Sequence, residues 1–392
     1  MITEKQDIQV MVSLPSASAK AAQTLNIAGH GDVFVASDPE GIQLGSGGGT
    51  AYILHQAYLV SGASSLRHWL SGGRKMLIHG SGESRRLPAY AALGKPLMPM
   101  PLIEGMTGQK PGQTLLDFQM SAYERFFLHA PSPYFLMIAC GDVLVEDDSW
   151  LPPYPDADVM IVGLSATDDE AQQHGVLVCG RESGRLTNFL QKPSLSQLSA
   201  LPEASSFYLD SGVWLLTETN DQPECYDLYG QFGLALGEAP TRTDEGISTL
   251  RAATLPLRQG RFYHFGTNRS LLGSLQQLKR PSRGLTAFGD SAMQPEGKPV
   301  ILNSQVDCQL SPDNRFIWIE NAHISKGWRL QQRHMLTGIP ENAWVLRLPA
   351  GLCLDVVPLT DGSSCLRPYG FDDTFRGALN AEHTTWMGTP VM

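Results

Sequence analysis

The feature that most constrains this chain is an apolar segment that runs directly into a glycine-rich loop with two arginines. Lys75–His79 has the pattern of a buried strand, and Gly80–Arg86 follows it as GSGESRR. Lys95 comes nine residues after Arg86 and is followed at once by Pro96. A strand that enters a glycine loop places backbone N–H groups where an anion can bind, and the cationic side chains add positive charge. The segment therefore predicts the binding of a polyphosphate.

A tight turn with surface arginines is the simpler interpretation of this segment. A turn, however, requires neither Arg-Arg-Leu-Pro nor Gly-Lys-Pro at this spacing. The segment is not a Walker A loop, because no Gly-Lys-Ser/Thr closes it. Arg86 and Lys95 are the best candidates to contact a triphosphate, and Gly80, Gly82 and Ser84 are the candidates in the loop itself.

A second glycine-rich stretch, Gly45–Thr50, lies upstream, and a helix is expected at Thr50–Leu59 directly after it. The stretch is either a flexible loop or the start of a helix that faces the nucleotide, where glycines allow close backbone approach. The following helix favours the second interpretation. The predicted nucleotide-binding residues here are Gly45, Gly47, Gly48, Gly49 and Thr50.

Strands alternate with helices over the first 285 residues, which predicts an α/β, Rossmann-like domain with a mostly parallel sheet. Ligands of such sheets bind at the carboxyl ends of the strands, where the Gly80 loop and Asp142 would lie. The expected strands are Asp32–Ser37, Lys75–His79, Tyr134–Cys140, Val159–Leu164, Gly175–Cys179, Leu186–Leu190 and Ser211–Leu216, and further helices are expected at Thr114–Leu128 and Arg269–Leu278.

The pattern changes after residue 278. Lys279–Pro299 is rich in Gly, Pro and Ser and is typical of a linker. Beyond it, apolar residues recur at a step of six, at Val306, Trp318, Ile324, Leu330 and Leu336. This step predicts a hexapeptide β-helix, with a left-handed coil expected, over residues 286–392. An antiparallel sandwich with chance spacing is the alternative, and a homo-oligomer through the repeat is conceivable.

Composition excludes several classes of protein. With 392 residues the chain is long enough for two domains, and its net charge of −10 argues against a general nucleic-acid binder. The six cysteines show no CxxC spacing, which disfavours a zinc site and suits a reducing compartment. Neither a signal peptide nor a membrane span is expected, so the prediction is a cytoplasmic protein.

Several motifs together resemble those of the sugar-1-phosphate nucleotidyltransferases, which have a GT-A-like fold. GSGESRRLP…LGKP is similar to that family's phosphate loop, and Asp142 resembles its metal-binding aspartate. The remaining matches are Phe189–Pro193 to the segment whose lysine holds the sugar phosphate, Tyr208–Trp214 to the following strand, and Phe262–Thr267 to the W-x-D-x-G-T motif.

One branch of that family fits more closely. Leu44–Thr50 before the phosphate loop, His264 in FYHFGT, and the tail formed by Tyr369–Asp373 and Thr385–Gly388 resemble the fucose-1-phosphate guanylyltransferases. These occur alone or as the N-terminal half of bifunctional fucokinase/guanylyltransferase proteins, so a fused or downstream fucokinase is a possible partner. The resemblance covers the chain from about Asp38 to its end.

The resemblance implies that GTP and L-fucose 1-phosphate form GDP-L-fucose and pyrophosphate by Mg²⁺-assisted in-line attack on the α-phosphorus. Arg86, Lys95 and Lys192 would be the catalytic residues and Asp142 the metal ligand. Lys192, Asp210, Gly212 and His264 would bind the sugar phosphate.

The chain departs from the wider family at two positions. His264 replaces a second metal-binding aspartate, and neutral imidazole is a poor ligand for Mg²⁺. Asp210 or Asp227 could assist Asp142 instead. Gln191 stands where the wider family has a glutamate.

Residue chemistry alone specifies neither fucose nor guanine. A mannose- or heptose-1-phosphate nucleotidyltransferase is the alternative within the same class. A non-catalytic nucleotide-sugar sensor or scaffold is the alternative from another class.

Overall fold

The chain separates into two compact units. The computed structural model describes residues 8–25, 33–82, 84–103, 109–147, 151–217, 227–257, 259–278, 297–373 and 384–391. The first unit comprises Met1–Gly82, Pro96–Met98 and Thr114–Phe262, and the second comprises Glu83–Lys95, Pro99–Gln113 and Tyr263–Met392. The sequence boundary between residues 285 and 286 lies outside the described residues, and the division there stays a prediction.

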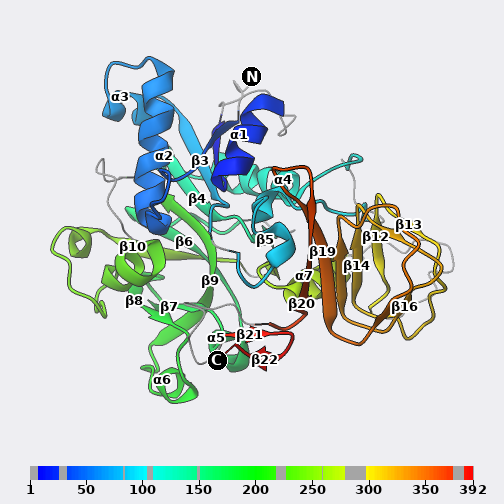
Figure 1. Cartoon of the computed structure of the whole chain (residues 1–392). Coiled ribbons are helices and arrows are strands. Elements are labelled where there is room, and N and C mark those ends of the chain that lie inside the picture. The colour runs from blue at the N-terminus through cyan, green and yellow to red at the C-terminus, as the bar shows by residue number, and fades with distance from the viewer. Residues whose placement is uncertain are drawn as a thin grey trace, which may run out of the picture. The chain divides into compact units, whose positions relative to one another are not determined.

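A mixed, mostly parallel sheet forms the centre of the first unit (Figure 1). Its strands follow the order β10-β6-β9-β4-β3-β1-β2, and β9 is the one strand of this path that runs antiparallel to its neighbours. This confirms the predicted α/β class. The strands of the path are β1 (Ile8–Ser13), β2 (Phe34–Ala36), β3 (Arg74–His79), β4 (Leu136–Cys140), β6 (Val159–Leu164), β9 (Ser205–Leu216) and β10 (Ala252–Leu257).

Helices and short strands complete this unit. β7 (Gly175–Gly180) pairs with β9 and with β8 (Leu186–Gln191), and β5 (Val143–Glu146) pairs with β11 (Arg261–His264). The helices are α1 (Ser16–Leu25), α2 (Gly45–Ser61), α3 (Leu66–Ser71), α4 (Leu115–His129), α5 (Asp168–Ala171) and α6 (Leu195–Ser199), with the π-helix η3 (Leu228–Gly233) and the 3₁₀ turns η2 (Lys95–Leu97) and η4 (Ile247–Thr249). None of the helices among the described residues has the length and apolarity needed to cross a membrane.

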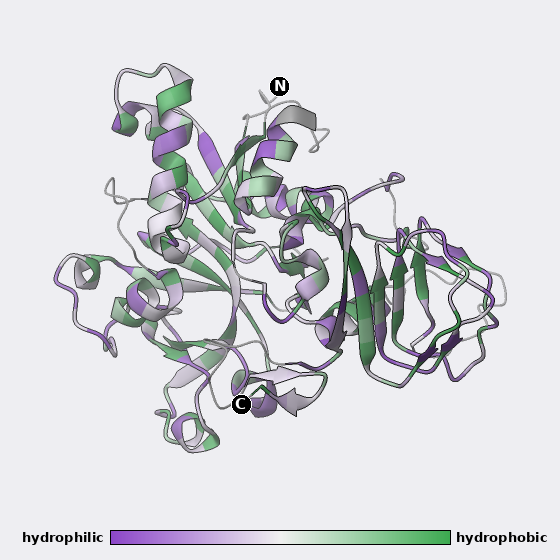
Figure 2. Ribbon diagram, viewed as in Figure 1, coloured by the Kyte–Doolittle hydropathy of each residue, from purple (hydrophilic) through white to green (hydrophobic). Residues whose placement is uncertain are grey.

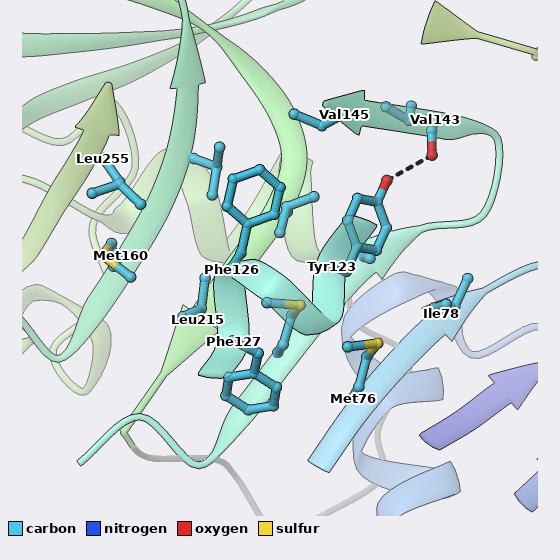
Figure 3. Packing of buried hydrophobic residues seen from close by; sticks show 14 of the residues in the cluster. Met76, Ile78, Tyr123, Phe126, Phe127, Val143, Val145, Met160, Leu215 and Leu255 are labelled. Atoms are coloured by element: carbon cyan, nitrogen blue, oxygen red, sulfur yellow. Dashed lines mark hydrogen bonds between the residues drawn. The ribbon is translucent and has the colours of Figure 1, made fainter. Parts of the chain in front are cut away.

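The sheet has an apolar core on each face, because successive side chains of a strand point to opposite faces. In β3, Met76 and Ile78 pack with α4, while Leu77 packs with α2 and α3 on the other face. Figure 3 shows Tyr123, Phe126 and Phe127 of α4 gathered with Met76 and Ile78, and Figure 2 shows how apolar the central strands are. Burial on both faces accounts for the continuous apolar runs in the sequence.

Local signals in the sequence set the bounds of α4. Thr114 caps its N-terminus, and Asp117 closes the capping box, accepting a hydrogen bond from the Thr114 N–H at 2.7 Å. Tyr123 then attaches the helix to strand β5, because its hydroxyl donates to the Val143 carbonyl at 2.7 Å (Figure 3). The helix predicted at Thr114–Leu128 is therefore confirmed within one residue at each end.

Four parallel strands end side by side at one edge of the sheet. Ser13 is in register with Ala36 and His79, and His79 is in register with Cys140. The loops that leave this edge start with Gly80 and Gly141. Pro96 packs so tightly on both glycines that an added Cβ would lie 2.6 Å from the Pro96 Cδ at Gly80 and 2.7 Å from its Cγ at Gly141.

The second unit consists largely of short parallel strands. Residues 306 and 324 pair, as do residues 330 and 348, and residue 336 pairs with residues 319 and 354. The five apolar positions at the step of six all lie in strands, and partners in adjacent strands are 17 or 18 residues apart in the chain. Two later pairs, β19 with β20 and β21 with β22, are antiparallel.

The elements of this unit are η1 (Pro88–Tyr90), α7 (Asn268–Leu278), β12 (Val300–Leu302), β13 (Gln305–Val306), β14 (Ile317–Glu320), β15 (His323–Ile324), β16 (Arg329–Leu330), β17 (His334–Thr337), β18 (Arg347–Leu348), β19 (Leu352–Pro358), β20 (Ser364–Gly370), β21 (Thr385–Trp386) and β22 (Thr389–Pro390).

Gly80→Ala is expected to lower the free energy of unfolding by about 1–3 kcal/mol, since the new methyl group would overlap Pro96 and the Ser13 carbonyl. Gly82→Ala is the matched control: nothing lies within 4 Å of its added Cβ, and a change below about 0.5 kcal/mol is expected. Urea unfolding of both variants measures the difference. Equal losses of stability would show that the close approach at Gly80 is unimportant.

Candidate functional site

A hydrogen-bonded chain of three side chains joins two strand ends to helix α2. His79 Nδ1 lies 3.3 Å from Ser13 Oγ, and His79 Nε2 lies 2.8 Å from Thr50 Oγ1. Thr50 Oγ1 also donates to the Ser46 carbonyl at 2.7 Å. Because the Thr50 hydroxyl donates to the Ser46 carbonyl, it accepts from His79 Nε2–H, and a neutral imidazole then has no proton on Nδ1. Burial lowers the pKa of His79 to about 4, in agreement with a neutral ring.

Ser13 also fixes the start of the predicted phosphate loop, Gly80–Arg86. The Gly80 N–H donates to the Ser13 carbonyl at 2.8 Å and lies 3.0 Å from Ser13 Oγ. The Ser81 N–H donates to the same oxygen at 3.3 Å, and the two serine hydroxyls are 3.1 Å apart. The first turn of the predicted anion-binding loop is thus attached to the end of β1.

The glycine-rich stretch at Gly45–Thr50 is not a loop. It forms the first turns of α2, and Gly45, the first residue of the helix, has a φ of +73° that favours glycine. Gly48, Gly49 and Thr50 are buried. The interpretation as a helix start is therefore correct, whereas the expected loop before Thr50 is wrong: the helix begins five residues earlier, because neighbouring packing overrides the low helix propensity of glycine.

Asp38 lies beside this helix start. Its Oδ2 accepts the Leu44 N–H at 3.3 Å, and its Oδ1 is buried with no hydrogen-bond partner among the described residues. A Cβ added to Gly49 would lie 3.3 Å from Oδ1, so glycine leaves room for the carboxylate. Burial raises the pKa of Asp38.

Asp142 and Asp210 lie in one neighbourhood at the end of β4. Cys140 Sγ donates to Asp142 Oδ1 at 3.0 Å, and a Cβ on Gly212 would lie 2.9 Å from the Cys140 Cβ. Burial raises the pKa of Tyr229 well above its usual value, and the nearby Cys140, Asp210 and Asp142 raise it further. The structure therefore brings together Asp142, Asp210 and Gly212 of the predicted set.

Asp210 is a buried carboxyl group with structural partners. Its Oδ1 accepts the Gly212 N–H at 2.9 Å and the Trp214 Nε1–H at 3.1 Å. Burial raises its pKa to about 6, although both hydrogen bonds act in the opposite direction. Asp210 thus holds the left-handed backbone of Gly212, which has a φ of +72°.

Asp227 caps a helix. Its Oδ1 accepts from the Ser46 hydroxyl at 2.8 Å and from the Tyr229 N–H at 3.3 Å, while its Oδ2 accepts from the Gly230 N–H at 2.8 Å. These contacts connect the start of η3 to the start of α2. They engage both oxygens that a metal ion would need.

Two predicted site residues have an unusual backbone conformation. Ser84 and Lys192 both have a φ of +48°, in the left-handed region that residues other than glycine seldom adopt. The Lys192 N–H donates to the His174 carbonyl at 3.0 Å, and its side chain is exposed. Such strain persists where the surroundings impose it, often at binding sites.

The remaining predicted residues belong to the second unit. Arg86 and Lys95 lie in the segment Glu83–Lys95, and His264 lies at the end of β11, where its carbonyl accepts from the Ser274 hydroxyl at 2.8 Å. The structure therefore groups the predicted residues in two sets, one in each unit.

A metal ion held by Asp142 would have to take most of its ligands from substrate and water. No group of three His, Cys, Asp or Glu side chains suited to a metal ion occurs in the described ranges. Mg²⁺ is commonly bound by one or two carboxylates together with phosphate oxygens and water. A single carboxylate such as Asp142 suits that mode.

Sequence reasoning missed Ser13, Asp38 and His79 as site residues. The signal was present, because Ser13 and His79 are the polar residues that end two buried apolar strands. Nothing in the sequence showed that the two strands are neighbours.

Comparison with known proteins supports the resemblance. Residues 70–222 match the family described as "Fucose pyrophosphorylase domain", a range that includes the Gly80 loop, Asp142, Lys192, Asp210 and Gly212. The chain is 38% identical over 398 residues to "L-fucokinase/L-fucose-1-P guanylyltransferase" of Bacteroides fragilis, covering 98% of this chain and 42% of that protein.

Two further comparisons are weaker. "Bifunctional fucokinase/GDP-fucose pyrophosphorylase" of Arabidopsis thaliana is 25% identical over 202 residues, covering 45% of this chain and 19% of that protein. The solved structure of HddC from Yersinia pseudotuberculosis complexed with GMP-PN aligns at 11% identity with a TM-score of 0.28, covering 69% of this chain and 99% of that one. A TM-score this low does not establish a shared fold.

The chain thus spans less than half the length of either curated relative. The match over residues 70–222 and the identity along almost the whole chain confirm the resemblance read from the glycine loops: the chain contains a fucose pyrophosphorylase domain and is related to proteins that combine fucokinase with fucose-1-phosphate guanylyltransferase.

Proposed function

We propose that this chain is a fucose-1-phosphate guanylyltransferase, which forms GDP-L-fucose and pyrophosphate from GTP and L-fucose 1-phosphate. The observation that carries the proposal is the phosphate loop held at the carboxyl edge of the sheet, within the residues that match the fucose pyrophosphorylase domain. The printed name of the Bacteroides fragilis relative supports the same activity.

The reaction requires alignment and charge neutralisation more than proton transfer. The attacking oxygen of a sugar 1-phosphate is already anionic near neutral pH, so no general base is needed. Arg86 and Lys95 would hold the β- and γ-phosphates and stabilise the departing pyrophosphate, and Lys192 would hold the sugar phosphate in line. Each group offsets the repulsion between two anionic substrates.

Magnesium is the proposed cofactor, with Asp142 as its protein ligand. When bound, the ion would neutralise phosphate charge. The hydrogen bond that Cys140 Sγ donates to Asp142 Oδ1 at 3.0 Å orients that carboxylate oxygen. Asp210 and Asp227 accept hydrogen bonds from backbone N–H groups, which favours structural roles for these two carboxylates. His264 is proposed as a contact to the sugar phosphate.

The second unit is proposed to be a β-helix with three short strands in each coil. Support comes from the parallel pairing of strands whose partner residues are 18 positions apart, which equals three steps of six, or 17 positions apart, one residue fewer. A fucokinase that supplies fucose 1-phosphate is the proposed functional partner, because the names of both relatives include a fucokinase activity.

We expect pyrophosphate release with GTP and L-fucose 1-phosphate to exceed that of every other substrate pair. The measurement crosses the four nucleoside triphosphates with fucose, mannose and heptose 1-phosphates in the presence of Mg²⁺. A preference for mannose or heptose 1-phosphate would show that the chain is a nucleotidyltransferase with a different sugar substrate. Release with no pair, together with tight binding of GDP-fucose, would instead support a sensor.

Lys95→Ala is expected to lower the turnover number by about 10²–10³, as removal of one preorganised charge donor does at other active sites. Lys326→Ala is the control, because Lys326 is an exposed lysine of the same unit. Steady-state release of pyrophosphate measures both. Normal turnover of Lys95→Ala would remove Lys95 from the site.

The buried His79, which lies between Ser13 and Thr50, predicts a pH dependence of stability. Burial lowers the folded-state pKa to about 4, whereas an unfolded histidine has a pKa of about 6.5. The unfolded chain therefore binds more protons between these values, and the free energy of unfolding falls as the pH is lowered through this window. His79→Gln is expected to reduce the pH dependence of the free energy of unfolding in this window by at most about 1.4 kcal/mol per pH unit.

Urea unfolding at pH 7 and pH 4.5 tests this expectation. Asp210, with its pKa raised to about 6, contributes a slope of opposite sign, but it is present in both chains and cancels in the comparison. His129→Gln, at the exposed end of α4, is the control. Equal slopes for wild type and His79→Gln would contradict a buried neutral imidazole.

A further inference from the structure

Arg86 and Lys95 lie on one short, internally bonded segment. The Leu87 N–H donates to the Ser84 carbonyl at 2.9 Å, which closes a turn around Arg86. The Tyr90 N–H donates to the Leu87 carbonyl at 3.1 Å, and the Gly94 N–H donates to the Tyr90 carbonyl at 3.0 Å, directly before Lys95. Tyr90 therefore connects the turn of Arg86 with the turn that leads to Lys95.

The Tyr90 side chain is buried against strand β14. Its hydroxyl donates to Glu320 Oε2, and its ring meets the Trp318 ring edge-on with centroids 6.4 Å apart. Trp318 Nε1–H donates to the same Glu320 oxygen at 3.1 Å, and Asn321 Nδ2 donates to Oε1 at 3.2 Å. Tyr90 is 2% exposed and Glu320 9% exposed, so water competes little for these hydrogen bonds.

Arg367 forms a second attachment of the same segment. Its Nη2 donates to the Pro88 carbonyl at 3.0 Å, and its guanidinium forms a two-pronged ion pair with Asp355, at 2.9 Å from Nε to Oδ1 and 2.5 Å from Nη2 to Oδ2. Asp355 and Arg367 face each other across β19 and β20. A bidentate pair of this kind orients the guanidinium rigidly.

We propose that Glu320 and Arg367 are positioning residues for nucleoside-triphosphate binding, because they hold through Tyr90 and Pro88 the segment that carries Arg86 and Lys95. The inference rests on the proposed function. Its geometry lies entirely within the second unit, since the segment and both strands that hold it belong there. The strands of the C-terminal repeat then contribute to binding at a distance from any contact with substrate.

Tyr90→Phe and Arg367→Met test the two attachments, and Arg367→Lys is the conservative variant. Tyr90→Phe keeps the ring that packs on Trp318 and leaves Glu320 with its other donors, so the chain should fold. Asp307→Asn is the matched control: it alters the 3.0 Å contact with His323 Nε2 in the same unit, and the partners of Asp307, which are Gln305 and His323, lie outside residues 84–95.

Two readouts are compared with the wild type. Hydrogen exchange at the amides of Leu87, Tyr90 and Gly94 should become at least several-fold faster in Tyr90→Phe and Arg367→Met. The dissociation constant for GTP, measured by calorimetry, should rise about tenfold, as expected for the loss of one hydrogen bond to a charged group. Binding of fucose 1-phosphate should be unchanged, and Arg367→Lys should recover part of the GTP affinity.

The outcomes separate this inference from the proposed function. Unchanged exchange in both variants, or faster exchange with unchanged GTP affinity, would overturn the positioning roles. A wild-type chain that binds GTP but releases no pyrophosphate with any substrate pair would overturn the proposed activity alone. A chain that binds no nucleoside triphosphate would overturn both.

Discussion

The contact of Pro96 with Gly80 and Gly141 is the constraint on which the candidate site depends. One pyrrolidine ring fills the space above two adjacent strand ends, and any side chain at either glycine would occupy that space. The ring follows Lys95 in the chain, and Asp142 follows Gly141. The same close approach therefore fixes the backbone that leads to a predicted cation and the backbone that leads to a predicted metal ligand.

A buried imidazole serves the same edge in a different way. His79 has a partner at each ring nitrogen, Ser13 on one side and Thr50 on the other. The low pKa of the buried ring keeps it neutral in the physiological range, so it adds no charge at this edge of the sheet. The start of α2 and the residues that lead into the predicted phosphate loop are thus linked through one side chain.

The sequence predicted well what depends on local pattern. β6 was expected with its observed bounds and α4 within one residue, because a buried strand and a capped helix each have their own signal. β1 was not foreseen, although it is central to the sheet, because its neighbours lie far away in the chain. For the same reason Ser13 could not be assigned to the site. Asp210 illustrates a different limit: a motif located it, but the sequence did not show that it also stabilises the backbone of β9 through Gly212 and Trp214.

The distribution of charge explains why a rigid segment with Arg86 and Lys95 matters to the proposed binding of anionic substrates. The chain has a net charge of −10, and its proposed substrates are anions. Binding them requires a few cations held in place, since a flexible lysine or arginine loses rotational freedom on each binding event. The segment with Arg86 and Lys95 contains only single turns and cannot be rigid by itself. Glu320 and Arg367 supply that rigidity from strands of a repeat, in which each strand is braced by its neighbours. On this argument, the affinity for the triphosphate is set partly by residues more than 200 positions away from the loop that first predicted it.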